Sequence, residues 1–344
     1  MLLAKSLNLS LYSPCNMLTM YPNKIFADKI SAALESGVFP EQPENLYAPI
    51  TYILSLSGKR IRPLLVLLGA DLFGISRIED ALPASVAIEY FHNFSLLHDD
   101  IMDKAPLRRG QQTVHQKWNE NIAILSGDAL LVKAYEQLSL CPSAHIPELL
   151  RLFNRVALEV CEGQQLDMDF EEMNGITQEQ YIHMIRLKTS VLLGGALEMG
   201  AVLANAPSED RQRLYEFGVN LGIAFQLQDD ILDAFGDPDT FGKQVGGDII
   251  VNKKTILHIL LQQSLRDDDK ILFEQLLNMS EQEASYKVAQ MKQLYEQYAI
   301  KATADELKQA YTQKAFANLE AIQVAPERKA DLIELANSLM YRVR

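Results

Sequence analysis

Two acidic motifs of the form DDxxD stand 130 residues apart in this chain of 344 residues. Their aspartates are Asp99, Asp100 and Asp103 in the first motif and Asp229, Asp230 and Asp233 in the second. Each motif lies in an apolar run without glycine or proline, and the spacing of its apolar residues predicts a helix. Because residues four apart share one face of a helix, the outer aspartates of each motif should project together.

Two carboxylates on one face of a core helix are unfavourable by themselves. Like charges repel, and a buried carboxylate without a partner is costly. Divalent cations would remove this repulsion, and a ligand set made only of oxygen suits Mg²⁺ or Mn²⁺ that also bind water and phosphate oxygens. One motif alone would more simply be an exposed acidic face. Two motifs in core-like helices favour two facing helices with a metal cluster between them.

Short basic clusters could supply further positive charge to a phosphate-bearing ligand. They contain Lys59, Arg62, Arg108, Arg109, Lys188, Lys243, Lys253 and Lys254. Arginine presents a planar fork that matches phosphate oxygens, whereas lysine acts as a point charge. A solvated salt-bridge face is the simpler explanation for any one cluster alone. His92 lies two helical turns before Asp99 and shares its face, although a core histidine is the simpler explanation for that residue alone.

The composition is that of an ordinary globular protein, with 48% hydrophobic and 22% charged residues. The net charge of −13 argues against nucleic acid or an anionic membrane surface as a partner. Cys15, Cys141 and Cys161 form no CxxC motif, which argues against a zinc site or a disulfide framework and favours a reducing, cytoplasmic location. No apolar run approaches the roughly 18 residues of a transmembrane segment.

The elements that must position these residues are predicted to be helices almost throughout. Helical periodicity, without sustained alternation, continues from Pro22 onward. The predicted helical segments are Lys24 to Glu35, Leu46 to Leu56, Arg62 to Gly74, Ile78 to Lys104, Asn119 to Leu140, His145 to Glu171, Thr177 to Ala204 with a break near Lys188, Ser208 to a point before Pro238, and shorter segments from Thr255 to Arg344. We expect residues 1–19 to be a flexible extension, with a misassigned start as the alternative, and residues 20–344 to form a single all-α domain.

With these motifs, the chain resembles the trans-isoprenyl diphosphate synthases of the polyprenyl synthetase family, in particular the short-chain farnesyl and geranylgeranyl diphosphate synthases. The resemblance extends from about Gly58 to Lys254. Its motifs are GKRIRP, HNFSLLHDDIMD, RRG, GDALL, GQQLD, KT and FQLQDDILDAFGD, followed by GK and NKK. It implies the isoprenoid synthase fold, a helical bundle around a central cavity. It also implies Mg²⁺-dependent condensation of isopentenyl diphosphate with dimethylallyl, geranyl or farnesyl diphosphate into all-trans products.

The resemblance also implies a role for each matching residue. Three Mg²⁺ ions per active site, which Mn²⁺ could replace, would be bound by Asp99, Asp103 and Asp229, with Asp100, Asp230 and Asp233 in support. The allylic diphosphate would contact Arg108, Lys188 and Lys243, and isopentenyl diphosphate would contact Lys59, Arg62, His92 and Arg109, with Lys253 as a further substrate-binding residue. Thr189, Gln226 and the helix break at Lys188 would stabilise a carbocation.

Product length should depend on side chains that precede Asp99 on the same helix. Phe94 and Ser95 lie five and four residues upstream of it. Phe94 is large enough to block a growing chain, whereas Ser95 is small and leaves a gap beside it. In the family that this chain resembles, this combination favours a C20 product, with C15 second and C30 or longer not expected.

Two other classes of protein share part of this sequence pattern. A class I terpene cyclase would share the fold and the first motif, but its second motif usually mixes Asn or Asp with Ser or Thr and Glu. A non-catalytic subunit of a heteromeric synthase generally lacks part of one aspartate motif, and both motifs are complete here. The resemblance also implies a homodimer, and the segment from Asn119 to Leu140 has apolar residues on more than one face, as an interface helix would need.

Overall fold

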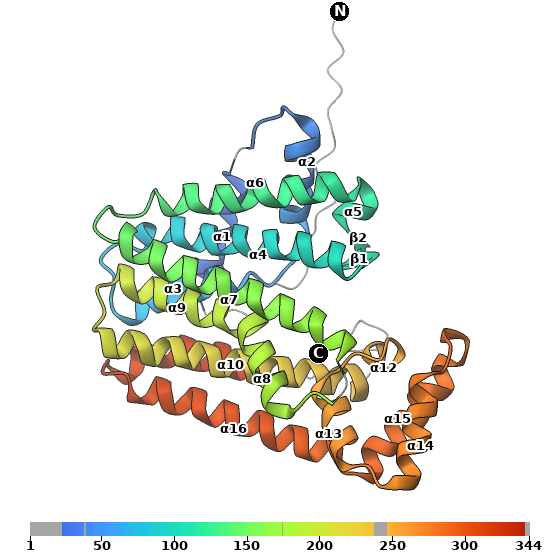
Figure 1. The fold of residues 1–344 in the computed structure, drawn as a ribbon. Coiled ribbons are helices and arrows are strands. Elements are labelled where there is room, and N and C mark those ends of the chain that lie inside the picture. Colours follow the sequence, from blue (N-terminus) through green and yellow to red (C-terminus); the bar gives the residue numbers. More distant parts are fainter. Residues whose placement is uncertain (1–22, 38, 174, 237–245, 341–344) are drawn as a thin grey trace, which may run out of the picture.

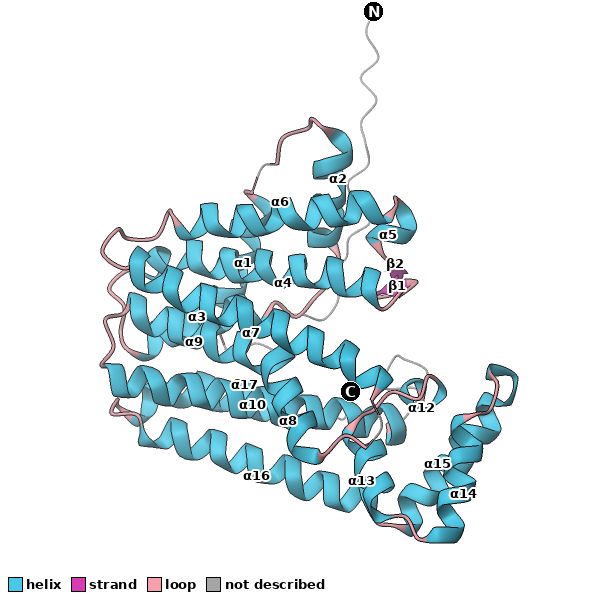
Figure 2. Ribbon diagram, viewed as in Figure 1, coloured by secondary structure: helices cyan, strands magenta, loops and turns pink. Residues whose placement is uncertain are grey.

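The computed structural model describes residues 23–37, 39–173, 175–236 and 246–340, and these residues are almost entirely helical (Figure 1, Figure 2). The longer helices are α1 (Lys24–Glu35), α2 (Glu44–Ser55), α3 (Ile61–Leu72), α4 (Leu82–Met102), α6 (Glu120–Leu138), α7 (Ile146–Glu172), α8 (Gln178–Ile185), α9 (Val191–Leu203), α10 (Ser208–Phe235), α13 (Ile256–Ser264), α14 (Asp267–Leu277), α15 (Ala284–Gln297), α16 (Ile300–Ala321) and α17 (Ala330–Met340). This architecture confirms the predicted all-α fold.

Several short elements connect these helices. They are α5 (Val114–Lys117), α12 (Gly247–Ile250), the 3₁₀ turns η1 (Ile78–Ala81), η3 (Glu281–Glu283) and η4 (Pro326–Lys329), the π-helical turn η2 (Arg186–Ser190), and the antiparallel strands β1 (Leu107–Arg108) and β2 (Gln111–Gln112). The turn η2 confirms the predicted break near Lys188. The hairpin of β1 and β2 was not predicted, because strands of two residues are too short to show alternation.

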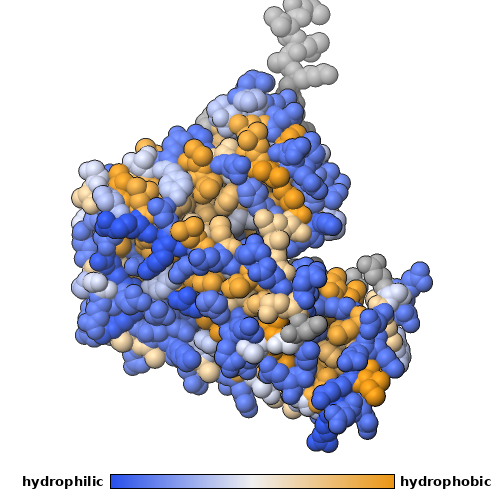
Figure 3. Space-filling model, in the orientation of Figure 1, coloured by the Kyte–Doolittle hydropathy of each residue, from blue (hydrophilic) through white to orange (hydrophobic). Residues whose placement is uncertain are grey.

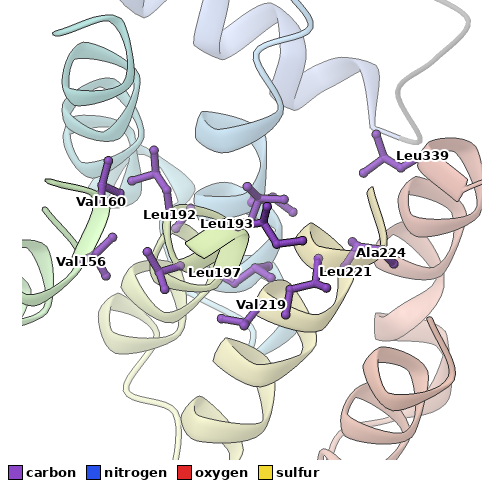
Figure 4. Packing of buried hydrophobic residues seen from close by; sticks show 14 of the residues in the cluster. Val156, Val160, Leu192, Leu193, Leu197, Val219, Leu221, Ala224 and Leu339 are labelled. Atoms are coloured by element: carbon purple, nitrogen blue, oxygen red, sulfur yellow. The ribbon is translucent and has the colours of Figure 1, made fainter. Parts of the chain in front are cut away.

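The core is a series of helices that pack in the order α16, α10, α9, α3, α4 and α6, each against the next (Figure 1). Helix α9 lies in the middle and is apolar except for Glu198, which pairs with Arg155 of α7, as expected for a helix that is covered on almost all sides. Figure 4 shows Leu192, Leu193 and Leu197 of α9 between Val156 of α7 and Val219 of α10. These apolar contacts hold the helices that carry the two acidic motifs on opposite sides of α9.

Gly200 lets α9 and α3 approach closely. A Cβ atom at this position would lie 2.0 Å from the Val66 carbonyl oxygen, which is too close for any other residue. The relative placement of α3 and α9 therefore depends on small residues as well as on large apolar ones.

The predicted segment from Ile78 to Lys104 is two elements in the structure, η1 and α4, and α4 ends at Met102. Asp103 is therefore the C-cap residue of α4 rather than an interior helical residue. The predicted boundary between an extension and a domain at residue 20 lies outside the described residues and stays a prediction. None of the described helices combines the length and the apolar character needed to cross a membrane.

Candidate active site

The first acidic motif is at the C-terminal end of α4. The Asp103 amide donates to the Asp99 carbonyl oxygen over 2.8 Å, so these residues lie one helical turn apart on the same face. Burial, and then the charge of Asp99, raises the pKa of Asp103 from its usual 3.8 to about 6. The predicted conflict between the two outer carboxylates is therefore present in the ligand-free protein.

The second motif lies in the last turns of α10, close to the segment of residues 246–256. The Asp233 carboxylate accepts a hydrogen bond of 3.0 Å from the Asp248 amide, and the Gly246 amide donates to the Asp233 carbonyl oxygen. Asp248 and Asp103 both line a cavity of about 530 Å³, together with Asp167 and Lys253. Elements adjoining the two motifs thus meet around one space.

The middle aspartate of the first motif is buried and paired with an arginine. The Arg108 Nε donates to both carboxylate oxygens of Asp100 at 2.8 Å, and Arg108 Nη2 lies 3.5 Å from Asp99. Burial lowers the pKa of Arg108, but the hydrogen bonds and charges of these aspartates outweigh that effect and raise it. Arg108 thus orients Asp100 and keeps one guanidinium nitrogen next to the outer aspartate.

The middle aspartate of the second motif is also buried, but it is held by uncharged donors. Asp230 accepts hydrogen bonds from the Tyr181 hydroxyl, from Gln226 Nε2 at 3.2 Å and from the Ile256 amide at 3.2 Å. Burial raises the pKa of Asp230 to about 7 in spite of these donors. Asp100 and Asp230 are thus both buried and hydrogen-bonded, and their supporting role at a metal site stays a prediction.

Lys188 projects from the π-helical turn η2 toward the first motif. Its ammonium donates to Asp167 of α7 and lies 3.3 Å from Asp99 Oδ1. Burial lowers the pKa of Lys188, but Asp99 and Asp167 raise it by a larger amount. This close packing requires Gly163, because a Cβ atom there would lie 2.1 Å from the Lys188 amide nitrogen. Glycine at this position thus allows η2 to present Lys188 to the aspartates.

Lys253 lies between the two motifs. Burial lowers the pKa of its ammonium, but the charges of Asp248, Asp167, Asp230 and Asp103 raise it overall. Carboxylates from α10, α12, α7 and the C-terminal end of α4 therefore stabilise the charged form of this one lysine.

An apolar cavity of about 380 Å³ extends from these charged groups. Its polar lining includes Asp99, Lys188, Thr189 and Gln226, and also His98, Gln164 and Gln165. The other lining residues are largely apolar and include Phe91, Phe94, Leu96, Met102, Val160, Met168, Leu192 and Phe225. A cavity that combines charged groups with a largely apolar wall suits a ligand with an anionic head and a hydrocarbon tail.

A third cavity, of about 330 Å³, is lined by Lys59, Arg60, Arg62, His92, Arg109 and Glu89 among others. We call these six residues the basic cradle. Among the described residues, Glu89 is the only acidic one that lines this cavity. Its carboxylate accepts from Arg60 and, at 3.0 Å, from Asn93 Nδ2. The lining thus contains four basic side chains and one carboxylate, a charge balance that suits an anion.

Arg62 and His92 contact each other inside this cradle. Arg62 Nη1 lies 3.1 Å from His92 Nε2, and a guanidinium can only donate, so the imidazole must accept. Burial, and then the charge of Arg62, lowers the pKa of His92 well below its usual value. His92 is therefore neutral and carries its proton on Nδ1. Both residues also line the apolar cavity, so the two cavities share this wall.

The acidic motifs fit Mg²⁺ that shares its ligands with a substrate. Asp99 Oδ1 is buried and accepts no hydrogen bond from any residue that the structure describes, although Lys188 is near it. Among the described residues, no three His, Cys, Asp or Glu side chains are grouped closely enough to hold an ion alone. An ion between the motifs would therefore need phosphate and water oxygens as well, which is the usual situation for Mg²⁺.

Comparison with known proteins identifies the family. Residues 43–298 match the family model described as polyprenyl synthetase, which is well over half of the chain. The chain belongs to the polyprenyl synthetase family. The predicted resemblance, and with it the prediction of an enzyme that transfers prenyl groups, is confirmed.

Relatives within the family include synthases of different product lengths. The geranylgeranyl diphosphate synthase of Methanosarcina mazei is 41% identical over 232 residues, which are 67% of this chain and 71% of that protein. A geranylfarnesyl diphosphate synthase of Natronomonas pharaonis is 36% identical over 66% of this chain and 72% of that protein. A crystal structure of a geranylgeranyl pyrophosphate synthase is 44% identical, with a TM-score of 0.85 over 92% of this chain and 96% of that one. These names favour a synthase over a terpene cyclase.

This polyprenyl synthetase also has functional candidates to which sequence reasoning assigned no role. Asp167 contacts Lys188, Tyr181 contacts Asp230, and Glu89 contacts Arg60. Asp167 could have been found, because it ends the GQQLD motif. Tyr181 and Glu89 gave no comparable signal, because their partners lie 49 and 29 residues away.

Lys243 lies outside the described residues, so its predicted contact with the allylic diphosphate stays a prediction. Lys254 donates to the carbonyl oxygens of Phe170 at 2.6 Å and Glu171 at 2.9 Å. It therefore caps the C-terminal end of α7.

Proposed function

We propose that this polyprenyl synthetase condenses isopentenyl diphosphate with dimethylallyl, geranyl and farnesyl diphosphate to all-trans products of C15 to C20, with C20 favoured. The wall shared by the basic cradle and the apolar cavity carries this proposal. An isopentenyl diphosphate bound by Lys59, Arg62 and Arg109 would have its hydrocarbon end beyond His92, facing the allylic substrate. A cyclase acting on one substrate has no need for the second anion site.

The allylic diphosphate would bind next to the charged groups of the apolar cavity. Lys188 and Arg108 would donate to its oxygens, and Asp99, Asp103 and Asp229 would hold three Mg²⁺ ions, or Mn²⁺ in their place. Bound Mg²⁺ neutralises the negative charge that develops on a leaving diphosphate. The buried Asp100 and Asp230 keep the neighbouring outer aspartates in position, because their own carboxylates are held by Arg108 and Tyr181.

The reaction would begin when the bond between C1 of the allylic substrate and its diphosphate oxygen breaks. Thr189 and Gln226 line the cavity beside Lys188 and would place side-chain oxygens near the resulting allylic cation. The double bond of isopentenyl diphosphate attacks this cation, and the C2 proton then passes to the released diphosphate. The apolar walls exclude water, which would otherwise quench the cation.

Product length would be limited by Phe94. Its ring packs edge-on against His98 at a centroid distance of 4.7 Å, and it packs at a tilt against Phe91 at 5.6 Å, so it is supported by both rings. Ser95 Oγ donates to the His92 carbonyl oxygen of its own helix, which leaves the space beside Phe94 open. This pairing of one supported ring with one small side chain favours C20 over C15.

The product is tested by mass analysis of reactions that contain isopentenyl diphosphate, Mg²⁺ and each of the three primers. We expect C20 from the wild type and longer products from Phe94→Ala, because removal of the ring opens volume at the end of the cavity. Phe316→Ala, on α16 and away from the cavity lining, should give the wild-type product. A wild-type product of C30 or longer, or no lengthening in Phe94→Ala, would contradict the assignment.

A homodimer is proposed for the same enzyme. Exposed apolar side chains gather on α6, where Leu125 is 60% and Val132 is 66% exposed, and on α7, where Leu158 is 64% exposed. Figure 3 shows hydrophobic surface over these helices. Burial of such a face in a two-fold interface would remove it from water. Sedimentation velocity should give the mass of a dimer, and a stable monomer would contradict this assignment.

A cytoplasmic location is proposed from the thiols. Cys141 and Cys161 are free cysteines in the described part of the chain, as expected for a reducing compartment.

A further inference from the structure

The hairpin formed by α14 and α15 lies at the edge of the molecule next to α12 (Figure 1). Its residues do not line any of the three cavities described above. Its most unusual residue is Lys287, whose side chain is 1% exposed and which has no carboxylate within 4.0 Å among the described residues. A buried ammonium without an ion pair is costly, and burial lowers the pKa of Lys287 accordingly. The burial of Lys287 therefore calls for a structural explanation.

Lys287 and its neighbours contact one short part of the chain that lies next to the second motif. Lys287 Nζ donates to the Ile250 carbonyl oxygen over 2.9 Å, at the C-terminal end of α12. Val288 packs against Gly246, where an added Cβ atom would lie 2.8 Å from a Val288 methyl carbon. Asn252 Nδ2 donates to the Leu277 carbonyl oxygen at the end of α14 over 2.9 Å. Both helices of the hairpin therefore hold the segment of residues 246–256.

The other side of this segment is bound to the second acidic motif. The amides of Gly246 and Asp248 donate to Asp233, and the Ile256 amide donates to Asp230. Asp248 and Lys253 of the same segment line the cavity of about 530 Å³ that Asp103 and Asp167 also line. The segment is thus fixed between the hairpin and α10.

We propose that the α14–α15 hairpin is a bracket for the metal side of the active site, and that Lys287 is a positioning residue for it. This inference rests on the proposed function, because it takes the allylic diphosphate and its Mg²⁺ ions to be the ligands of that side. Without Lys287, the Ile250 carbonyl oxygen loses its donor, and α12 loses its hydrogen bond to α15. Asp248 and Lys253 are then held less firmly, by the remaining contacts of the segment. The basic cradle is built from the loop before α3, the first turn of α3, α4 and the residues around β1, so it is not affected.

The test uses Lys287→Met, which keeps the length of the side chain and removes its charge and its donor. Titration calorimetry with inorganic pyrophosphate, with and without Mg²⁺, gives the Mg²⁺-dependent part of the binding. We expect this part to weaken roughly tenfold or more, as is usual when a group that positions metal ligands is lost. The apparent KM for the allylic substrate should rise by a similar factor, while the KM for isopentenyl diphosphate should not change.

The matched control is Lys270→Met on α14, because Lys270 is exposed and pairs with Asp267 in the first turn of its own helix. It should bind Mg²⁺ and pyrophosphate like the wild type. General destabilisation would lower the active fraction of Lys287→Met without separating the two KM values. Wild-type binding by Lys287→Met, or an equal rise in both KM values, would overturn the inference.

A second variant keeps the test decisive if Lys287→Met fails to fold. Val288→Ala removes the methyl groups that support Gly246 and retains Lys287, so it should weaken the same Mg²⁺-dependent binding by a few-fold. No weakening in Val288→Ala would contradict the role of the hairpin. A wild-type enzyme that forms no prenyl diphosphate would instead refute the proposed function, and the pyrophosphate titrations would still report on the bracket.

Discussion

Two arginines of the basic cradle and three basic residues of the metal side have pKa values that shift in opposite directions. In the basic cradle, burial and then neighbouring cations lower the pKa of Arg109, and burial lowers that of Arg62 to about 10. On the metal side, burial has the same tendency, but aspartates outweigh it and raise the pKa values of Arg108, Lys188 and Lys253. Basic residues of one site therefore lie near other cations in the cradle and near aspartates on the metal side.

This difference indicates how each side obtains its ligand. The cradle holds excess positive charge before any substrate arrives, so an anion relieves repulsion that is already present. The metal side has its cations paired with aspartates, so a diphosphate gains little there until divalent ions add positive charge. We infer that isopentenyl diphosphate binds without metal, whereas the allylic diphosphate requires it.

The largest effect should follow from the loss of a carboxylate on the metal side. Asp99→Ala, and equally Asp103→Ala or Asp229→Ala, should lower kcat by roughly 100-fold to 1000-fold, because stabilisation of the leaving diphosphate is lost. The dissociation constant of isopentenyl diphosphate, measured by calorimetry without Mg²⁺, should stay at its wild-type value in Asp99→Ala. Asp169→Ala serves as the control, because Asp169 is exposed on α7 and accepts from Gln165. Wild-type turnover in Asp99→Ala at saturating Mg²⁺ would contradict the metal assignment.

The contrast between the two sides is only partly visible in the sequence. The motifs predicted which cations lie near which substrate, and the helical periodicity predicted the helices that carry them. The pairing of Lys188 with Asp167 was not predicted, because it depends on how closely α7 crosses η2 at Gly163. Packing distances of this kind are set by tertiary contacts, and no local pattern encodes them.

Buried charges explain most of what sequence reasoning missed. Glu89 lies in an otherwise apolar part of α4, and Lys287 lies in a polar part of α15 where an exposed residue would be expected. Both side chains are almost fully buried. Glu89 accepts a hydrogen bond from Arg60, and Lys287 donates one to the Ile250 carbonyl oxygen, so the partner of each lies far away in the chain. Hydrophobic periodicity predicts which face of a helix is covered. It does not reveal a charged residue that is covered because it binds another element.

An intermediate effect should separate the two substrates kinetically. Lys59→Ala should raise the apparent KM for isopentenyl diphosphate about tenfold, and Lys188→Ala should do the same for the allylic substrate, because each removes a charge from one side only. Steady-state rates with one substrate saturating and the other varied measure both constants. An equal rise of both KM values in either variant would show that the two sides do not bind separate substrates.

The smallest effect concerns stability without ligands, and its sign should differ between the two sides. Arg62 is charged at neutral pH although its surroundings lower its pKa, and its buried Nε has no hydrogen-bond partner among the described residues. Arg62→Met should therefore raise the Tm of the ligand-free protein by about 2 °C, since a disfavoured buried charge is removed. Lys188→Met should lower the Tm by a similar amount, because Asp99 and Asp167 then lose the ammonium between them. Calorimetry in the presence of a chelator measures both changes. A fall in Tm for both variants would mean that Arg62 does not destabilise the ligand-free cradle. The opposite pKa shifts would then not correspond to a difference in stability between the two sides.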